Sequence, residues 1–200
     1  MEQLKQAILE RGQVKGADIL KVDTFLNHQL DVQLLNAIGR EFHKRFGHKP
    51  ITKILTIEAS GIAIAAIAAQ YFNVPVVFAK KVASKNLDDS TYETKVFSFT
   101  KAKEYTVRVS KKFINEDDHI LILDDFLARG RAALGLLDLV QQAGASAQGV
   151  GIVIEKGFQE GGDLLKEKGI HLESLAIIKA FENGQPVFSE SPASPKEIAS

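Results

Sequence analysis

The chain has no cysteine, which excludes disulfide bonds and thiolate metal sites. It also has no long hydrophobic run, since no stretch approaches the roughly 18 apolar residues of a membrane span. Neither sign of charge is in excess, because 25 Lys and Arg balance 25 Asp and Glu. That balance argues against a general nucleic-acid binder. The opening MEQLKQAILERGQ carries charges within its apolar pattern and lacks the core of a signal peptide. We therefore expect a soluble, cytoplasmic protein.

The order of apolar runs and turns predicts an α/β fold. With 200 residues, 45% of them hydrophobic, the chain can form one domain with a sizeable core. A β-branched run over 53–57, an Ala-rich helical stretch over 62–72 and an apolar run over 76–79 form a strand, a helix and a strand. The same order recurs over 120–123, 131–143 and 149–154. Such units predict a mostly parallel, five-stranded twisted sheet flanked by helices.

The two ends of the chain have simpler patterns. Helical spacing predicts helices over 1–12 and 32–46, while 18–26 alternates weakly and is expected to be extended. The last ten residues, 191–200, contain two Pro and three Ser and are expected to be a disordered tail.

A basic region lies between the two strand–helix–strand units. Residues 80–112 contain nine Lys and Arg against four Asp and Glu. Residues 92–99 and 104–109 alternate like hairpin strands, and 84–91 resembles the mobile tip of a loop. The cationic surplus favours an anionic ligand, although a solvated basic hairpin explains this region equally well.

The richest stretch for chemistry is ILILDDFLARGRAA, residues 120–133. Four apolar residues bring Asp124 and Asp125 to the carboxyl end of a buried strand, where ligands bind in open α/β sheets. Adjacent carboxylates repel each other unless sugar hydroxyls or a metal-bound sugar offset the repulsion. Ala128–Ala132 then form a short loop that opens a helix and offers N–H groups to an anion. This pattern favours a phosphorylated pentose; a capping Asp with surface arginines is the alternative.

These residues resemble the phosphoribosyl-diphosphate signature of type I phosphoribosyltransferases. The usual loop is closer to ATGGT, so ARGRA lacks the hydroxyl that commonly binds the 5′-phosphate. Backbone amides and an arginine would have to replace that hydroxyl. LKVDTFLNHQ (20–29) and VIEKGF (153–158) are similar to the bacterial branch of the family that salvages xanthine. The resemblance extends from residue 1 to about 190.

The resemblance implies a single domain over 1–190 that forms homodimers. A small hood would come from about 1–50 and 155–190, and a flexible hairpin flap from about 80–105. The implied substrates are xanthine and phosphoribosyl diphosphate, with neither nucleic acid nor membrane as a partner. Mg²⁺ would be bound to the substrate, with few or no direct protein ligands.

The resemblance also implies a role for each motif. Asp124 and Asp125 would be the catalytic pair. The phosphoribosyl diphosphate would contact Ala128, Arg129, Gly130, Arg131 and Ala132 with one end and Glu58, Ala59, Ser60 and Gly61 with the other. An ordinary helix cap formed by Ser60 is the alternative for the second group. Xanthine would contact Leu20, Asn27, Lys156 and Phe158. Lys81, Lys85 and Lys101 are equal candidates for a flap contact with the diphosphate.

The implied reaction transfers 5-phosphoribosyl to N9 of xanthine, giving xanthosine 5′-monophosphate and diphosphate. One alternative is the same reaction with hypoxanthine or guanine as the preferred base. Another is a ligand-sensing regulator on the same fold. Kinase and hydrolase functions have no support, because the chain has neither a GxxxxGK[ST] loop nor a nucleophile elbow. The five histidines form no close pair that would suggest a metal site.

Overall fold

The computed structural model describes residues 1–16, 18–82, 90–98 and 103–189. The helical elements are α1 (Glu2–Arg11), the π-helical turn η1 (Asp23–Asn27), α2 (Val32–Phe46), α3 (Ser60–Phe72), α4 (Arg131–Gln142) and α5 (Gly161–Glu167). The strands are β1 (Gln13–Lys15), β2 (Ile19–Lys21), β3 (Lys53–Ile57), β4 (Val76–Val82), β5 (Thr91–Ser98), β6 (Lys103–Ser110), β7 (His119–Leu127), β8 (Ser146–Lys156), β9 (Leu172–Glu182) and β10 (Gln185–Phe188). The predicted helix over 32–46 coincides with α2.

The central sheet is mixed, with a parallel middle. Over the described residues its order is β10-β9-β8-β7-β3-β4-β6-β5, and β1 and β2 form a separate ribbon. The strands from β9 to β4 are parallel neighbours, which confirms a mostly parallel sheet. The predicted total of five strands is wrong, because β10 adds antiparallel to β9 at one edge and the β5–β6 hairpin adds antiparallel to β4 at the other.

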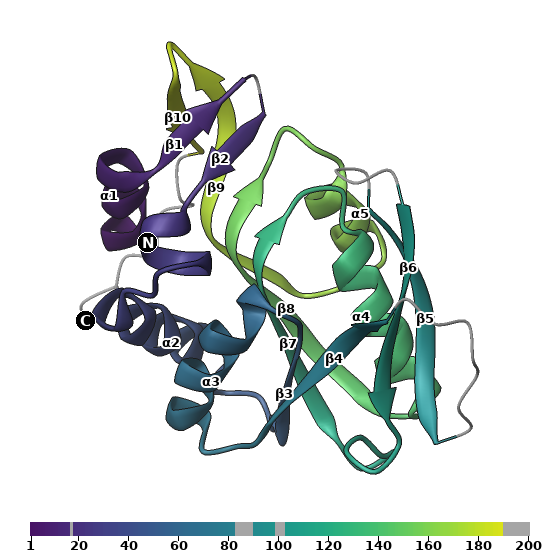
Figure 1. Cartoon of the computed structure of the whole chain (residues 1–200). Coiled ribbons are helices and arrows are strands. Elements are labelled where there is room, and N and C mark those ends of the chain that lie inside the picture. The colour runs from purple at the N-terminus through teal and green to yellow at the C-terminus, as the bar shows by residue number, and fades with distance from the viewer. Residues whose placement is uncertain (17, 83–89, 99–102, 190–200) are drawn as a thin grey trace.

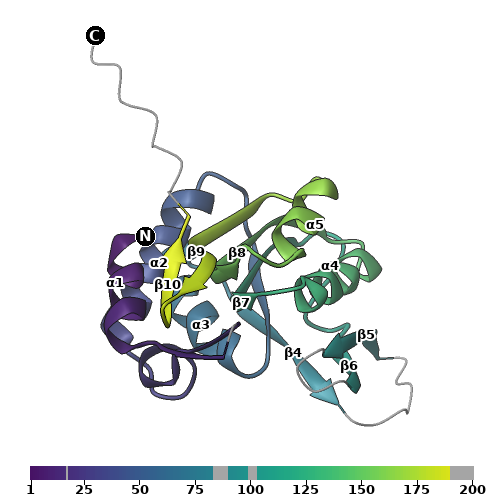
Figure 2. The same cartoon turned by 90° about the horizontal axis from the view of Figure 1, so that it is seen from above.

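Helices cover both faces of this sheet, as Figure 2 shows. Side chains alternate along β7, so Leu121 and Leu123 point to one face while Ile120 and Ile122 point to the other. The leucines belong to the core cluster that includes α2 and α3, and the isoleucines belong to the cluster that includes α4. Burial on both faces explains why the central strands read as continuous apolar runs.

Several predicted boundaries need correction. The segment over 18–26 is not one extended run, because β2 ends at Lys21 and the π-helical turn η1 follows it. The strand predicted over 120–123 continues to Leu127, since its ladder with β8 runs past the two aspartates. The predicted tail at 191–200 lies outside the described residues, as does most of the proposed tip at 84–91.

Segments from both ends of the chain meet above the carboxyl end of the sheet. In Figure 1, α1 and the β1–β2 ribbon lie beside β9 and β10. The Met1 amine donates to the Leu175 carbonyl at 2.6 Å, and Arg11 pairs with Asp31 at 2.8 Å. The α2 helix packs instead on the sheet. In the described part of the chain, no helix is both long and apolar enough to cross a membrane.

Candidate active site

The acidic pair lies near the carboxyl end of β7. Asp124 is only 5% exposed, and its Oδ1 accepts a hydrogen bond from the Asp125 N–H at 2.9 Å. Burial and the adjacent charge of Asp125 raise the pKa of Asp124 well above its usual range, although Lys81 acts in the opposite direction. A ligand that brings hydroxyl donors or positive charge would stabilise the ionised form of this carboxyl.

The turn 58–61 lies directly against this pair. A β-carbon at Gly61 would overlap Thr56 Oγ1 and lie 3.2 Å from Asp124 Oδ1, so only glycine permits this approach. The Lys81 N–H donates to Glu58 at 2.5 Å, which links the turn to the end of β4. The alternative of Ser60 as a cap is wrong, because α3 already begins at Ser60 and the capping position is Ala59.

The loop after β7 presents backbone N–H groups. Gly130 adopts φ +75°, a left-handed conformation that favours glycine, and is the residue before α4. The first bond of that helix runs from the Leu134 N–H to the Gly130 carbonyl. Helix α4 begins at Arg131, so the predicted five-residue loop includes the first two residues of the helix. Its initial N–H groups are available to an anion.

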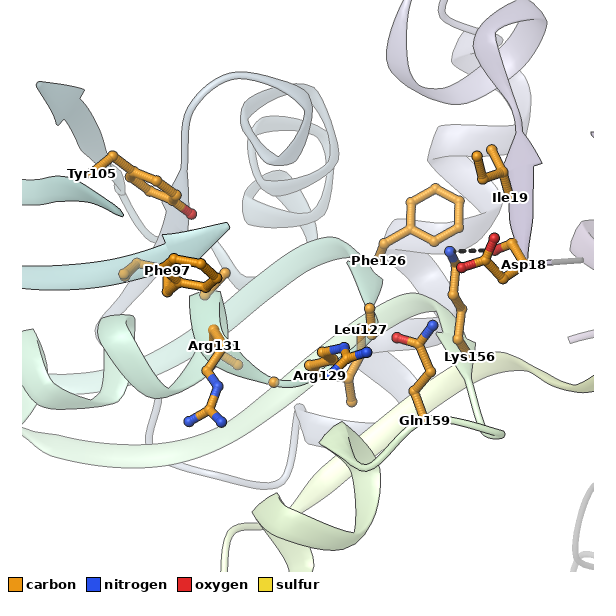
Figure 3. Close-up of a pocket in the computed structure, with 15 residues that line it drawn as sticks. Asp18, Ile19, Phe97, Tyr105, Phe126, Leu127, Arg129, Arg131, Lys156 and Gln159 are labelled. Carbon is orange, nitrogen blue, oxygen red and sulfur yellow. Dashed lines mark hydrogen bonds between the residues drawn. The ribbon is translucent and has the colours of Figure 1, made fainter. Parts of the chain in front are cut away.

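This loop forms part of a cavity of about 510 Å³, within the usual range for small-molecule sites. Figure 3 shows Arg129 and Arg131 of this loop, and Lys156 on the neighbouring strand. The cavity is lined by Asp18, Ile19, Val96, Phe97, Tyr105, Phe126, Leu127, Ala128, Arg129, Gly130, Arg131, Ala132, Ala133, Lys156 and Gln159.

Of the four residues predicted to contact a base, Lys156 lines this cavity. Its ammonium donates to the backbone carbonyl of Asp18 at 2.7 Å, the dashed line in Figure 3. Burial lowers the pKa of Lys156, an effect that the negative charge of Asp18 partly opposes. Lys156 is the last residue of β8, and its side chain is half-buried where it meets the hood.

The other three lie elsewhere in this conformation. Leu20 is 6% exposed and belongs to the core cluster, and Asn27 is exposed at the end of η1. Phe158 packs edge-on against Phe181, with ring centroids 5.7 Å apart. Their contact with a base remains a prediction.

The β5–β6 hairpin supplies the opposite wall of the cavity through Val96, Phe97 and Tyr105. Burial and the charge of Asp124 raise the pKa of Tyr105, so its hydroxyl stays protonated to a higher pH than usual. Lys81 lies 5.4 Å from the centre of the Tyr105 ring. The other two lysines proposed for the flap, Lys85 and Lys101, lie outside the described residues.

The basic surplus of this region is partly neutralised within the hairpin. Arg108 pairs with Glu93 at 3.0 Å, and Lys95 pairs with Glu104 at 3.1 Å. These two contacts account for part of the sequence pattern without a ligand.

Sequence reasoning missed several residues of the cavity wall, among them Asp18, Ile19, Phe126 and Gln159. Two of them had a local signal, because Phe126 directly follows the aspartates and Gln159 comes three residues after Lys156. Asp18 and Ile19 belong to the hood and lie far from the other lining residues in the sequence. No local sequence pattern indicated that they line the cavity.

Comparison with known proteins identifies this arrangement. The model of the family "Phosphoribosyl transferase domain" matches residues 21–182, and the chain belongs to this family. Its relatives include the xanthine phosphoribosyltransferase of Ruminiclostridium cellulolyticum, 65% identical over 95% of this chain and 100% of the relative. The xanthine phosphoribosyltransferase of Clostridioides difficile is 64% identical over 94% and 100% of the two chains.

Solved structures confirm the fold. The adenine phosphoribosyltransferase of Rhodothermus marinus superposes with a TM-score of 0.72, covering 89% of this chain and 100% of its own at 20% identity. The expected family and its α/β fold are thereby confirmed.

Proposed function

We propose that this protein transfers 5-phosphoribosyl from phosphoribosyl diphosphate to N9 of xanthine, giving xanthosine 5′-monophosphate and diphosphate. The observation that carries this proposal is one cavity that contains both the 128–132 loop and Lys156. A nucleotide needs a phosphate site and a base site within reach of each other. The names and high identity of the relatives support xanthine as the base.

In this proposal the sugar and its phosphates are bound by three groups. Asp124 and Asp125 accept hydrogen bonds from ribose hydroxyls. The N–H groups of 128–132 bind the 5′-phosphate, with Arg129 and Arg131 replacing the hydroxyl of the more usual loop. Glu58, Ala59, Ser60 and Gly61 contact the diphosphate, and the closeness of Gly61 to Asp124 supports this placement. Positioning and charge stabilisation then lower the barrier as the C1–diphosphate bond breaks.

The residues around the diphosphate fit a Mg²⁺ ion that arrives with the substrate. Mg²⁺ prefers oxygen ligands and keeps several waters. The ion would be bound largely by substrate oxygens and waters, with few or no direct ligands from this chain, and within the described residues no group of three or more His, Asp or Glu side chains could hold an ion. Bound Mg²⁺ would supply positive charge to the leaving diphosphate.

Xanthine selection is assigned to Lys156. An ammonium only donates hydrogen bonds, so it suits a keto oxygen rather than an amino group. Its charge also favours xanthine, the most acidic of the common purines. Hypoxanthine and guanine carry the same 6-keto group, which makes them the alternative preferred bases. Leu20, Asn27 and Phe158 would reach the base only after the hood moves.

The flap is proposed over about 80–105, which includes most of the β5–β6 hairpin, and the hood over about 1–50 and 155–190, which includes α1 and β10. Val96, Phe97 and Tyr105 already face the loop from across the cavity. Closure would exclude water, which otherwise hydrolyses the activated sugar. We also propose a homodimer, which sedimentation of the purified protein would test.

The first experiment is incubation with Mg²⁺, phosphoribosyl diphosphate and each of xanthine, guanine, hypoxanthine, adenine or orotate. Chromatography would identify the nucleotide formed. Xanthosine monophosphate as the main product supports the proposal, and another nucleotide contradicts the role of Lys156. Tight binding of the activated sugar without any product would instead favour a ligand-sensing regulator.

A further inference from the structure

A buried carboxylate with no role in the proposed reaction lies beside the cavity. Glu155 is 4% exposed, although it neighbours Lys156. Side chains alternate along β8, so the two residues point to opposite faces of the sheet. Lys156 points to the hood, whereas Glu155 points to the face covered by α4 and α5.

Glu155 is held between β9 and the first turn of α5. The Ser174 hydroxyl donates to Glu155 Oε2 at 2.5 Å. On the other side, a β-carbon at Gly162 would overlap Glu155 Oε1 and lie 3.1 Å from the carboxyl carbon. The missing side chain of Gly162 is therefore what lets the carboxyl group contact the start of α5.

The neighbouring glycine makes a similar contact with the phosphate-binding loop. The Gly161 N–H donates to the Ala128 carbonyl at 3.0 Å. A β-carbon at Gly161 would overlap that carbonyl and lie 2.7 Å from the Gly130 backbone nitrogen. Both neighbours are backbone atoms, which cannot yield by rotating a side chain. The two glycines thus bring Glu155, α5 and the loop into direct contact.

We propose that Glu155, Gly161 and Gly162 are positioning residues that hold the 128–132 loop in the position in which its N–H groups bind the 5′-phosphate. The inference rests on the proposed function, since it assigns that phosphate to the loop. Glu155 contacts α5, α5 contacts the loop, and none of the three touches the reacting atoms. Displacement of a binding group by about 1 Å can cost on the order of a hundredfold in rate.

Gly161→Ala tests this chain of contacts. It should raise the KM for phosphoribosyl diphosphate by about tenfold and leave the KM for xanthine within about twofold, because the loop moves and Lys156 does not. Gly149→Ala is the matched control. Its β-carbon would lie 2.6 Å from a Phe46 ring atom and 2.9 Å from the His171 carbonyl, at the far end of β8. It should lower Tm without changing either KM.

Equal rises in both KM values, or a lower Tm with both KM values unchanged, would overturn the proposal. Substitution of Glu155 gives a second test, should Gly161→Ala fold poorly. Glu155→Gln keeps the size of the side chain and an oxygen for Ser174, so it should retain the wild-type KM for phosphoribosyl diphosphate. Glu155→Ala should raise that KM as Gly161→Ala does. Equal KM values for the Gln and Ala variants would contradict the positioning role.

Calorimetric binding of phosphoribosyl diphosphate separates this proposal from the proposed function. If the wild type forms no xanthosine monophosphate, the proposed function fails. The positioning role then still predicts weaker binding of phosphoribosyl diphosphate by Gly161→Ala than by Gly149→Ala. Equal binding by these two variants would overturn the positioning role alone.

Discussion

Replacement of Lys156 by methionine should change the ranking of purines more than the overall rate. Methionine keeps much of the length and apolar stem of lysine but has neither the charge nor the donor. Xanthine would lose both the hydrogen bond to a keto oxygen and the attraction between its acidic ring system and the ammonium. Guanine and hypoxanthine would lose mainly the hydrogen bond.

The size of the effect follows from the surroundings of Lys156. A hydrogen bond to a charged group contributes about 1.5–3 kcal/mol. Lys156 is half-buried and already bonded to the Asp18 carbonyl at 2.7 Å, so we take the lower part of that range. Loss of this hydrogen bond corresponds to a fall in kcat/KM of roughly 10- to 30-fold for guanine and hypoxanthine. For xanthine the fall should be several-fold larger, because the attraction to the ammonium charge is lost as well.

The assay is kcat/KM for xanthine, guanine and hypoxanthine at saturating phosphoribosyl diphosphate. Lys49→Met is a matched control, because the Lys49 ammonium also donates to a β8-region carbonyl, that of Gln148 at 2.8 Å, away from the cavity. It should leave the ranking unchanged. A uniform loss for all three bases in Lys156→Met would refute the role assigned to this lysine.

Four further predictions concern other polar groups. The double variant Asp124→Asn/Asp125→Asn should lose turnover with every base in the nucleotide assay. Asp124→Asn alone should raise Tm at neutral pH, with the gain vanishing below about pH 4, because the raised pKa of Asp124 makes its charged form unfavourable as pH rises. Thr56→Val should raise stability in urea unfolding by about 1 kcal/mol, since Thr56 Oγ1 has no hydrogen-bond partner among the described residues. Asp118→Asn should lower Tm at pH 7 and lower it less in acid. Burial alone would raise the pKa of Asp118, but hydrogen bonds, led by the one from Lys53, lower it. The stability that the ionised Asp118 contributes is therefore lost as pH falls through that lowered pKa. For Asp124→Asn and for Asp118→Asn, a difference in Tm from the wild type that does not change with pH would contradict the corresponding argument.

The phosphate-binding part of the site could be predicted because its residues are close in sequence. Two aspartates, a glycine and the start of a helix lie within residues 124–132, so their spacing along the chain is enough to predict their arrangement. The turn 58–61 could be placed beside them because the carboxyl ends of parallel β3 and β7 meet at one sheet edge. The close contact of Gly61 with Asp124 follows that expectation.

Long-range contacts account for the parts that could not be predicted. The antiparallel edges of the sheet depend on where hairpins dock, and the β5–β6 pattern alone gave no partner strand. The bond from Lys156 to Asp18 joins residues far apart in the chain, so no local spacing indicated it. Nothing in the local sequence indicates the role of Gly161 and Gly162, because it depends on the atoms that a β-carbon at each position would overlap.

The sugar-phosphate groups and Lys156 lie on two different strands, with Leu127 of β7 beside Glu155 of β8 in the ladder. In the proposed assignment, the ends of β3 and β7 contact the substrate part common to all bases, and the end of β8 contacts the variable part. Base preference can then change by substitutions at Lys156 and in the hood that leave Glu155 and the β7 groups in place. Such a division makes the protein a practical starting point for enzymes that build nucleotides from non-natural bases.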